Sequence, residues 1–594
     1  MSKALPKRIM TNWYNPLVLV PTAIRVVIST IFGELADRRE AIAASNAIAP
    51  QPFDGSFDYS NEKGDFWFDF MADTGDGWNS TYAMARLISA GSLQPRGCKE
   101  PLSRGRLLVL GGDQVYPTAS REAYDERFLA PFEQAYEPAN GKPAWRRGSL
   151  DLLVVPGNHD WYDGLNSFFS LFCRRRVKPN SGIGSDRPGR IIAGRSTHQT
   201  RSYFAAKLPG GWWLWASDSQ LEGYIDEPQI EYFRHVAETW MAPGSKLILC
   251  VAQPSWAYVD EQDPRPAFTN FSYLERIAGA AKDASGNSLR HELKLVLTGD
   301  SHHYSRFEED RRQYVTCGGG GAFLHPTHQL ASRFFSWDYP PPGQNYRHGS
   351  AYKRGFKLAQ MPSGQPAIYP SRGDSWRLTF WNLAFPVLNR WFTATLALGY
   401  GLFDWLLDFN ARLAAHETLG DVLGAGSFGD AIANYWKLVV ISPAGAMMIL
   451  VALGAYYYAA DARNGWPRLL MGGLHALAQA SVVTVTTCAV MRMLPGVSSI
   501  WQVAAAAVSA AILSSATYGL YLLVSLLGFK RHWNEAFSSF AHRGYKCMLR
   551  MRIAPDGKLS IFPIGLKKVP FDRRETPRNP PLDPHLIEPP IVLQ

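Results

Sequence analysis

Cysteine is scarce in this chain of 594 residues, and its placement indicates neither a disulfide-stapled fold nor a thiolate metal site. The six cysteines are far apart, and no two of them form a Cys-X-X-Cys pair. Such spacing argues against a disulfide framework and against a cysteine-ligated zinc ion. Dispersed thiols of this kind are typical of proteins in a reducing compartment.

The chain also shows neither an internal repeat nor a nucleic-acid-binding module. Its net charge of +10 at pH 7 is moderate, and its basic residues do not alternate with the aromatic residues of a base-stacking surface. An anionic membrane surface is therefore a more natural acidic partner than a nucleic acid.

Long apolar runs are largely absent before residue 377, but they dominate residues 378–530. Four segments there approach the length of about 20 residues that a bilayer span requires. They cover residues 391–409, 436–460, 468–491 and 499–529. A buried helical core is the alternative, but four such runs in succession rarely belong to a soluble fold. We therefore predict a transmembrane domain of about four helices, of which the first is the weakest because Asp404 interrupts it.

The charges that flank these segments indicate the orientation of the chain in a membrane. The tail that follows the fourth segment is strongly basic, whereas the loop of residues 410–435 is mainly acidic. The positive-inside rule then places both termini in the cytoplasm. Near the N-terminus, Pro21 and Arg25 break an apolar run, which favours an interfacial or core-packed helix over residues 22–34 rather than a signal peptide.

One pair of polar residues lies within the third predicted span. His475 and Gln479 are one helical turn apart. This spacing fits a polar pathway through the membrane or, as the commoner case, an interhelical hydrogen bond.

Four apolar runs in the first half of the chain each end in glycine followed by polar side chains. Strands of one α/β sheet share a carboxyl edge, where ligands bind, so we expect these polar tips to converge. Hard oxygen ligands mixed with imidazole suit Mn, Fe or Zn, and two such ions about 3.5–4 Å apart can clamp both oxygens of an in-line phosphoryl displacement. The tips carry Asp73, then Asp113 and Tyr116, then Asn158 and His159, and finally Asp300, His302 and His303.

These motifs resemble those of the calcineurin-like metallophosphoesterases and, more narrowly, those of the purple acid phosphatase branch. Residues 73–75 match Asp-X-Gly, residues 112–116 match Gly-Asp-X-X-Tyr, and residues 157–160 read Gly-Asn-His-Asp. The ordered set covers residues 60–325, about half of the chain. The resemblance implies an α/β fold, a four-layer α/β/β/α sandwich, around a centre of two divalent or mixed-valence ions of Fe, Mn or Zn.

The resemblance also implies a role for each residue. Asp113 would bridge the two ions, Asp73, Tyr116 and His302 would complete one site, and Asn158 would serve the other. His159 would stabilise the transition state or protonate the leaving oxygen, and His303 is expected beside it as a second catalytic residue. Tyr116 as a ligand would favour a ferric ion, and its alternative is a tyrosine that packs beside the turn.

Two positions depart from the family pattern. The strand that should end in Val-X-X-His ends instead at Ala252 and Gln253, and the first histidine of the Gly-His-X-His motif is Asp300. Asp300 remains a good ligand for a hard cation, and Gln253 offers a weaker carbonyl oxygen. The second metal is therefore looser, more oxygen-ligated, or absent.

Two further segments are candidates for the rim of the site. Residues 316–328 contain four successive glycines, followed by His325 and His328, and form either a rim of the site or a tight sheet-edge loop. Residues 174–207 hold nine Lys or Arg and one Asp, and form either a solvated loop or a clamp for anionic substrate or headgroups. The residues predicted to bind an anion are Arg174, Arg175, Arg176, His198, His325 and His328.

The predicted organisation has five parts. Residues 1–58 form an N-terminal segment, 59–334 the metallophosphoesterase domain, 335–377 a linker, and 378–530 the transmembrane domain. Residues 531–594 form a basic cytoplasmic tail with a β-hairpin around residues 555–557 and a Pro-rich, disordered end beyond 570.

The predicted function is that of a multi-pass integral-membrane, metal-dependent phosphoesterase with a cytoplasmic catalytic domain. It would hydrolyse a phosphoester, with lipid-linked esters among the candidates, by attack of a metal-held hydroxide. The alternative is a non-catalytic membrane sensor that binds a ligand in a degenerate site, and a third hypothesis is a transport-coupled protein.

Overall fold

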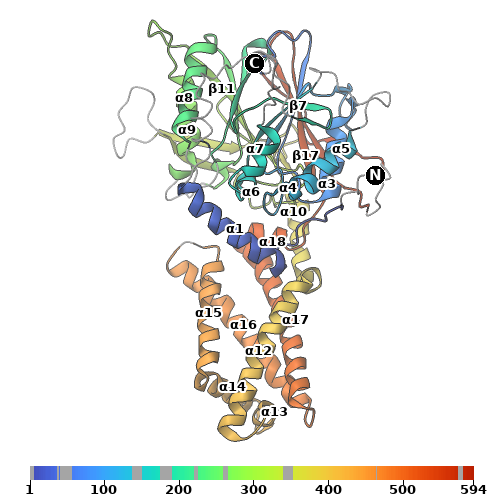
Figure 1. Ribbon diagram of the computed structural model, residues 1–594, viewed down its shortest axis with the longest axis vertical. Helices are drawn as coiled ribbons and strands as arrows, with labels where there is room; N and C mark the ends of the chain where they lie inside the picture. The colour runs from blue at the N-terminus through green and yellow to red at the C-terminus, as the bar shows by residue number, and fades with distance from the viewer. Residues whose placement is uncertain are drawn as a thin grey trace, which may run out of the picture. The chain divides into compact units, whose positions relative to one another are not determined.

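The computed structural model describes residues 6–35, 39, 57–136, 150–173, 190–219, 225–258, 265–338, 352–462, 464–572 and 580–594. The chain forms two compact units. Unit 1 comprises residues 1–11, 21–374 and 541–594, and unit 2 comprises residues 12–20 and 375–540. Unit 1 is mixed α/β, and unit 2 is helical (Figure 1).

The first of two large sheets in unit 1 has nine strands, in the order β19-β18-β17-β1-β4-β5-β7-β6, with β20 also paired to β18. The last two strands of this order are β7 (Arg195–Thr197) and β6 (Ile191–Ile192). Its centre is parallel and joins β1 (Phe66–Met71), β4 (Leu107–Gly111) and β5 (Asp151–Val155). These strands are almost entirely buried, as expected for parallel strands with short apolar sequences. The polar tips of all three strands therefore lie at one edge.

The second sheet also has nine strands, in the order β14-β15-β12-β13-β11-β10-β9-β8, with β16 (Ile368–Tyr369) paired to β12. Its parallel part joins β9 (Trp212–Ser217), β10 (Lys246–Val251), β11 (Glu292–Thr298) and β13 (Arg312–Cys317). The remaining strands are β8 (Phe204–Lys207), β12 (Tyr304–Glu309), β14 (Arg333–Asp338) and β15 (Tyr352–Leu358).

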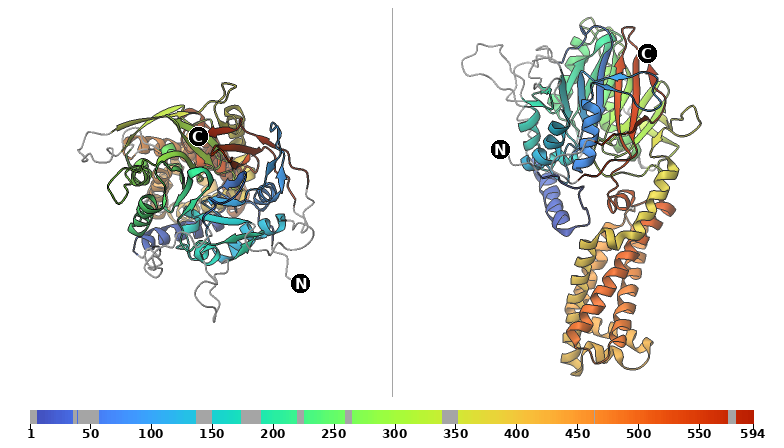
Figure 2. Two further views of the ribbon diagram at one scale, coloured as in Figure 1. Left: turned by 90° about the horizontal axis from the view of Figure 1, so that it is seen from above. Right: turned by 90° about the vertical axis from the view of Figure 1, so that its right-hand side faces the viewer.

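Each sheet lies beside its own helices (Figures 1 and 2), with which it shares a hydrophobic core. The core of the first sheet includes α3 (Trp78–Ser89), α5 (Ala130–Ala135) and α7 (Asn166–Phe172). The core of the second sheet includes α8 (Glu227–His235) and α9 (Arg265–Gly279), which also contact each other. Among the described residues, each sheet of unit 1 thus buries a hydrophobic core against its own helices.

The C-terminal segment is part of unit 1. Strands β17 (Lys546–Ile553) and β18 (Leu559–Leu566) pair antiparallel around the turn that contains Gly557, and β17 pairs with β1 along its length. The expectation of a disordered end beyond residue 570 is wrong for 584–593, where β19 (Pro584–Leu586) and β20 (Ile591–Leu593) pair with β18. These strands have three residues each, too short for a recognisable alternating pattern.

The predicted linker of residues 335–377 is likewise partly folded. Strand β15 pairs with β12 and β14, and β16 pairs with β12, so residues that read as a linker extend the second sheet. The helix α10 (Arg372–Thr379) begins at the boundary between the two units. In the described part of this range, Pro362 and Gly364 lie in the turn between β15 and β16 rather than in a spacer.

Unit 2 contains two helices that are long and apolar enough to cross a membrane, among the residues that the structure describes. These are α16 (Trp466–Met493) and α17 (Ser499–Phe529). Taken together, α14 (Phe428–Ile441) and α15 (Pro443–Ala459) are also long and apolar enough to cross a membrane, but the two helices are bent by 95° relative to each other. Taken as one span, this pair would give three crossings, so the predicted count of four remains a prediction.

The predicted span of residues 436–460 is not one straight helix, because the chain bends by 95° at Ser442, and its crossing of a membrane remains a prediction. The Ser442 hydroxyl accepts a hydrogen bond from the Gly445 amide at 3.1 Å, and Pro443 is the first residue of α15. A serine N-cap followed by proline is a standard helix start. The first predicted span lies in α12 (Arg390–Ala415), where Asp404 is fully buried and accepts a hydrogen bond from Thr487.

Two smaller predictions concern helices. Helix α1 (Pro16–Leu35) includes the predicted helix of residues 22–34 and begins six residues earlier, with Pro21 inside it. The Gln479 side-chain amide donates to His475 Nε2 at 3.1 Å and to the Ser514 carbonyl of α17 at 3.1 Å. The second of these bonds is the interhelical hydrogen bond that the sequence favoured.

Candidate metal centre

Three aspartates occupy left-handed backbone conformations immediately after three strands. Asp73 follows β1 with φ 57°, Asp113 follows β4 with φ 49°, and Asp300 follows β11 with φ 62°. Non-glycine residues rarely adopt positive φ, although aspartate and asparagine tolerate it best. Three such residues at adjoining strand ends indicate a functional constraint, because strained backbone clusters at functional sites.

Backbone contacts hold these three tips together. The Asp73 amide donates to the Gly112 carbonyl at 3.0 Å, which ties the end of β1 to the end of β4. The Asp300 amide donates to Asp73 Oδ2 at 2.9 Å, which links the second sheet to the first. A Cβ atom on Gly299 would lie 2.4 Å from the Ala72 side chain, so this approach requires glycine.

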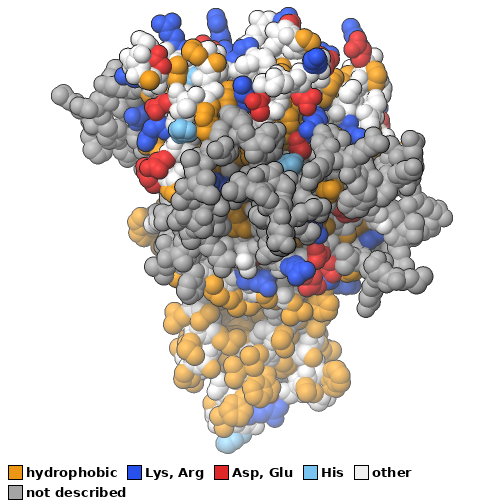
Figure 3. Space-filling model, turned by 45° about the horizontal axis from the view of Figure 1, so that its top comes forward, with side chains coloured by type: hydrophobic (Ala, Val, Ile, Leu, Met, Phe, Trp, Pro, Cys, Tyr) orange, Lys and Arg blue, Asp and Glu red, His pale blue; other side chains and the backbone are white. Residues whose placement is uncertain are grey.

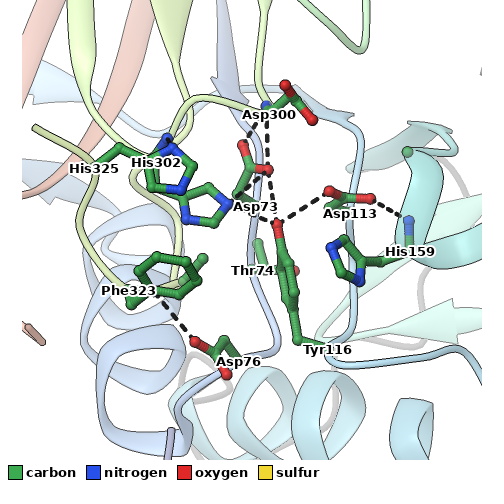
Figure 4. Close-up of polar contacts among 12 residues, drawn as sticks. Asp73, Thr74, Asp76, Asp113, Tyr116, His159, Asp300, His302, Phe323 and His325 are labelled. Atoms are coloured by element: carbon green, nitrogen blue, oxygen red, sulfur yellow. Dashed lines mark hydrogen bonds and ion pairs between the residues drawn. The ribbon is translucent and has the colours of Figure 1, made fainter. Parts of the chain in front are cut away.

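Tyr116 brings its hydroxyl to the centre of the cluster (Figure 4). The phenolic oxygen is 2.9 Å from Asp73 Oδ1, 3.1 Å from Asp113 Oδ2 and 3.0 Å from His302 Nε2. The ring is fully buried, and a cis peptide bond joins Tyr116 to Pro117. The hydroxyl therefore faces the carboxylates rather than merely packing beside the turn.

The cluster has more acceptors than protons. Tyr116 has one hydroxyl proton, yet carboxylate oxygens of both Asp73 and Asp113 lie within hydrogen-bonding distance of it. Burial, followed by repulsion from Asp300, raises the pKa of Asp113 to about 8. Burial and then Asp113 and Asp300 raise the pKa of Asp73 well above its usual range. Such a site favours uptake of positive charge, either as protons or as a cation.

The donor set has the chemistry of a hard-cation site. Its carboxylates and phenol are oxygen ligands, and the buried Asn158 Oδ1 and His302 Nδ1 have no hydrogen-bond partner. Within the described ranges, however, no group of three or more His, Cys, Asp or Glu side chains is arranged to hold a metal ion. Several of the ligand atoms are instead hydrogen-bonded to Tyr116.

His159 lies beside Asp113 and Tyr116. Its backbone amide donates to Asp113 Oδ1 at 2.9 Å, and its ring centroid is 4.3 Å from that of Tyr116. Its Nδ1–H donates to the Pro117 carbonyl at 2.7 Å, because a carbonyl can only accept. This fixes the tautomer with the lone pair on Nε2, and burial lowers the pKa of the ring to about 4.

Asp160 holds together the loop after β4 and the loop after β5, a role that the sequence analysis missed. The fully buried carboxylate accepts hydrogen bonds from the Gly157 amide at 2.9 Å, from the Gln114 amide at 3.2 Å and from the Tyr124 hydroxyl. It therefore ties the loop after β4 to the loop after β5. Its place as the last residue of the Gly-Asn-His-Asp motif was the signal that could have revealed it.

The glycine-rich loop packs directly against the Asp73 turn. The Gly320 and Ala322 amides donate to the Ala72 and Asp73 carbonyls, each at 2.9 Å. A Cβ atom on Gly320 would lie 2.4 Å from the Ala72 carbonyl oxygen, so close packing explains this glycine. The loop also brings His325 to the site, where its ring stacks on His302 at 3.8 Å and its Nδ1 accepts from the His302 amide at 3.1 Å.

Lys546 is a second residue that sequence reasoning missed. It comes from β17, and its fully buried ammonium donates to the Ala322 carbonyl. Burial lowers its pKa to about 8. No local motif could reveal this lysine, because it is more than 200 residues away from the loop that it contacts.

Other predicted residues are placed differently. Gln253 is exposed. Ala252 is buried, and its Cβ atom would lie 3.1 Å from a Cβ atom placed on Gly112. The ring of His303 is buried, and its carbonyl accepts from the Gly318 amide. His198 pairs with Asp151 at 3.3 Å at the start of β5, the opposite end of that strand from Asn158, so the structure does not bring it to the cluster.

The remaining predicted residues concern the basic insert and the rim. Arg174, Arg175 and Arg176 lie outside the described residues. His328 is half-buried three residues after His325, and its part in the site remains a prediction.

The comparisons with known proteins add little to what the geometry of the site indicates. Neither a family model nor a curated protein matches the sequence. A solved structure titled "GAP50 the anchor in the inner membrane complex of Plasmodium" is 12% identical, with a TM-score of 0.29, and the match covers 50% of this chain and 82% of that one. A second, "Structure of PhoD", is 11% identical, with a TM-score of 0.25, over 45% of this chain and 59% of that one. Neither likeness is close enough to bear on the fold or the activity.

Proposed function

We propose that unit 1 is a metal-dependent phosphoesterase with the four-layer α/β/β/α arrangement of the calcineurin-like metallophosphoesterases. Asp73, Asp113, Tyr116, Asn158 and His302 would hold Fe, Mn or Zn. Asp300 would add a carboxylate where the family pattern has histidine. When bound, two such ions supply Lewis-acid polarisation of a phosphoryl oxygen and an activated water.

A single observation supports this proposal most strongly. Two buried carboxylates and an imidazole surround one phenolic oxygen, and the single proton of that phenol can serve only one of the two carboxylates. Burying such a group of acceptors is costly unless a cation or protons neutralise it. The aspartates with left-handed backbone conformations, and the glycines packed against them, hold this arrangement in place.

His159 has the geometry of a residue that contacts the substrate. With Nδ1–H held by the Pro117 carbonyl, its Nε2 is an acceptor in the resting state. To protonate a leaving oxygen it must first take up a proton, and the negative charge of a bound phosphoester would favour that uptake. Burial lowers the pKa of the ring to about 4 in the free protein, so the bound phosphoester must raise it before the ring holds a proton near neutral pH.

Unit 2 would anchor this activity in a membrane. The apolar length of α16 and α17 supports spanning helices, and the basic residues that follow α17 support a cytoplasmic position for unit 1. A phosphoester at or near the membrane surface, lipid-linked esters included, is the substrate class that this attachment favours.

The test is a hydrolysis screen of the full chain purified in detergent. The protein is stripped with EDTA and reloaded separately with Mn²⁺, Fe²⁺ or Zn²⁺. It is then assayed on a nitrophenyl phosphate, a bis-nitrophenyl phosphate and phosphatidic acid vesicles. We expect turnover that is lost on stripping and restored by at least one ion. Absence of turnover on all three substrates with every ion would contradict the proposal, and phosphate binding without turnover would favour the sensor alternative.

A further inference from the structure

Unit 2 contains two cavities that share part of their walls. Their volumes are about 260 Å³ and about 200 Å³, and Leu396, Tyr400, Tyr456 and Gln479 line both. These shared residues come from α12, α15 and α16 (Figure 1). Taken together, the two cavities fall within the roughly 300–1,000 Å³ of ordinary ligand sites.

The two cavities have different linings. The larger one is bounded mainly by hydrocarbon side chains, including Phe403, Val439, Met448, Ile449 and Leu453. The smaller one is bounded by rings with polar tips, His475, Tyr518, Tyr521 and His532. The paired cavities are therefore amphipathic, with an apolar end and a hydrogen-bonding end.

His475, at the polar end, is held in a neutral tautomer. Its Nε2 accepts from the Gln479 amide nitrogen at 3.1 Å, and its ring stacks on Tyr521 at 4.0 Å. His532 Nε2 lies 3.0 Å from the Asp461 amide and 3.2 Å from the Ala459 carbonyl, and its Nδ1 lies 2.8 Å from Ser525 Oγ. These contacts hold the His532 ring in place at the polar end.

Gln479 leaves one acceptor without a donor. Its Nε2 donates to the Ser514 carbonyl at 3.1 Å as well as to His475, and both of these groups are acceptors, which fixes the orientation of the amide. The amide oxygen is then left buried with no hydrogen-bond partner, on a side chain that is only 5% exposed. A buried acceptor of this kind costs stability until a donor reaches it.

The linings also exclude a charged ligand. None of the residues that bound either cavity is Lys, Arg, Asp or Glu. Outside the cavities, the visible face of the helical unit is covered by hydrophobic side chains (Figure 3), and Leu450, Leu477 and Val440 are more than half exposed. A hydrocarbon ligand could therefore reach the cavities from the bilayer core.

We infer that the paired cavities bind one molecule of a neutral lipid alcohol. Its hydroxyl donates to Gln479 Oε1 at the polar end, and its hydrocarbon chain occupies the larger cavity. This site goes beyond the proposed hydrolysis in unit 1 and does not depend on it.

The test uses photoaffinity labelling of the full chain in phosphatidylcholine nanodiscs, with EDTA present so that no ester is hydrolysed. Three diazirine probes share one C16 chain and differ at one end, which is an alcohol, a plain hydrocarbon or a phosphate monoester. Labelled peptides are mapped by mass spectrometry, and unlabelled hexadecanol serves as the competitor. In the wild type we expect the alcohol probe to label α12, α15 and α16 at the cavity walls, and hexadecanol to displace it.

Three variants of α16 sharpen the test. Gln479→Leu removes the acceptor and should lower labelling by the alcohol about fivefold to tenfold, the value of one hydrogen bond, with hydrocarbon labelling unchanged. Ala480→Phe fills the larger cavity and should abolish labelling there. Leu477→Phe makes a similar change on an exposed position of the same helix and should have no effect.

Several results would overturn the inference. Equal labelling by the alcohol and the hydrocarbon in the wild type would mean ordinary contact with bilayer lipid. Stronger labelling by the phosphate ester would mean that the site takes an anion. If Gln479→Leu fails to fold, the competition in the wild type and the Ala480→Phe variant still decide the question.

Discussion

Replacement of Gly157 by alanine tests whether backbone packing positions the Asp113 carboxylate, which we propose as the bridge between two metal ions. A Cβ atom at this position would lie 2.1 Å from Asp113 Oδ1 and 2.5 Å from the Asp113 backbone nitrogen. The backbone at Gly157 is extended, with φ −102° and ψ −176°, so alanine meets no conformational strain of its own. Any effect must therefore come from the overlap with Asp113.

The overlap sets the size of the effect. Contacts of a Cβ atom below 3.0 Å are essentially unknown, so the 2.1 Å contact requires a displacement of about 0.9 Å. Because a backbone atom is also too close, rotation of the Asp113 side chain cannot relieve the overlap alone. Overpacking of this kind costs about 1–3 kcal/mol, and a misplacement of about 1 Å at a reactive group can lower a rate about 100-fold.

The assay compares Gly157→Ala with Gly91→Ala, because a Cβ at Gly91 would have nothing within 4 Å. Thermal unfolding in EDTA reports the packing cost, and kcat/KM on the best phosphoester from the screen reports the displaced carboxylate. We expect a lower Tm and about 100-fold lower kcat/KM in Gly157→Ala alone. Wild-type values for both quantities in this variant would refute the reasoning.

Three further predictions concern stability and topology. Burial lowers the pKa of His303 to about 3, against about 6.5 in the unfolded chain, so the unfolded state binds more protons below pH 6.5. The free energy of unfolding therefore falls as the pH drops, by about 2 kcal/mol at pH 5. Urea unfolding at pH 7 and pH 5 should show a smaller loss of stability in His303→Gln than in the wild type, and an equal loss would contradict this. Arg550→Met removes the close ion-pair partner of the buried Asp69 at 2.8 Å and leaves the longer contact with Arg195 at 3.9 Å; it should cost about 3–5 kcal/mol, whereas a loss below 1 kcal/mol would mean that the pair is dispensable. Reporters near residue 420 and after residue 594 should lie on opposite sides of the membrane if α14 and α15 form one broken span, and the same side would make that pair a re-entrant loop.

The strand ends of the candidate site could be predicted because their pattern is local. An apolar run that ends in an aspartate indicates a buried strand that ends at a polar edge. Asp73 follows β1 in this way, and Asp113 and Asp300 follow β4 and β11 directly after a glycine. The pattern could not predict the hydrogen-bonding role of Asp160. In the sequence, a carboxylate that accepts structural hydrogen bonds looks the same as a metal ligand.

The C-terminal part of unit 1 could not be predicted because its partners are distant in sequence. Asp69 lies in the otherwise apolar β1, and Arg550 lies in β17, which contains two further basic residues. In the structure they neutralise each other, and both side chains are fully buried. Pairing across 481 residues depends on tertiary contact, and neither strand alone indicates it.

The helical unit shows the same limit on a smaller scale. Apolar length correctly indicated α16 and α17, whereas the bend at Ser442 depends on a serine cap and a proline within an apolar run. Hydropathy averages over such a break, so residues 436–460 read as one span.

Metal stoichiometry tests the central claim most directly. The full chain and its Asp113→Asn variant would be stripped, reloaded with Mn²⁺, Fe²⁺ or Zn²⁺, desalted and analysed by elemental mass spectrometry, with the exposed turn variant Asp556→Asn as the matched control. The account predicts one or two ions per chain in the wild type and in Asp556→Asn, and loss of most of that metal in Asp113→Asn. A wild-type protein that retains none of the three ions, or an Asp113→Asn variant that retains them all, would contradict it.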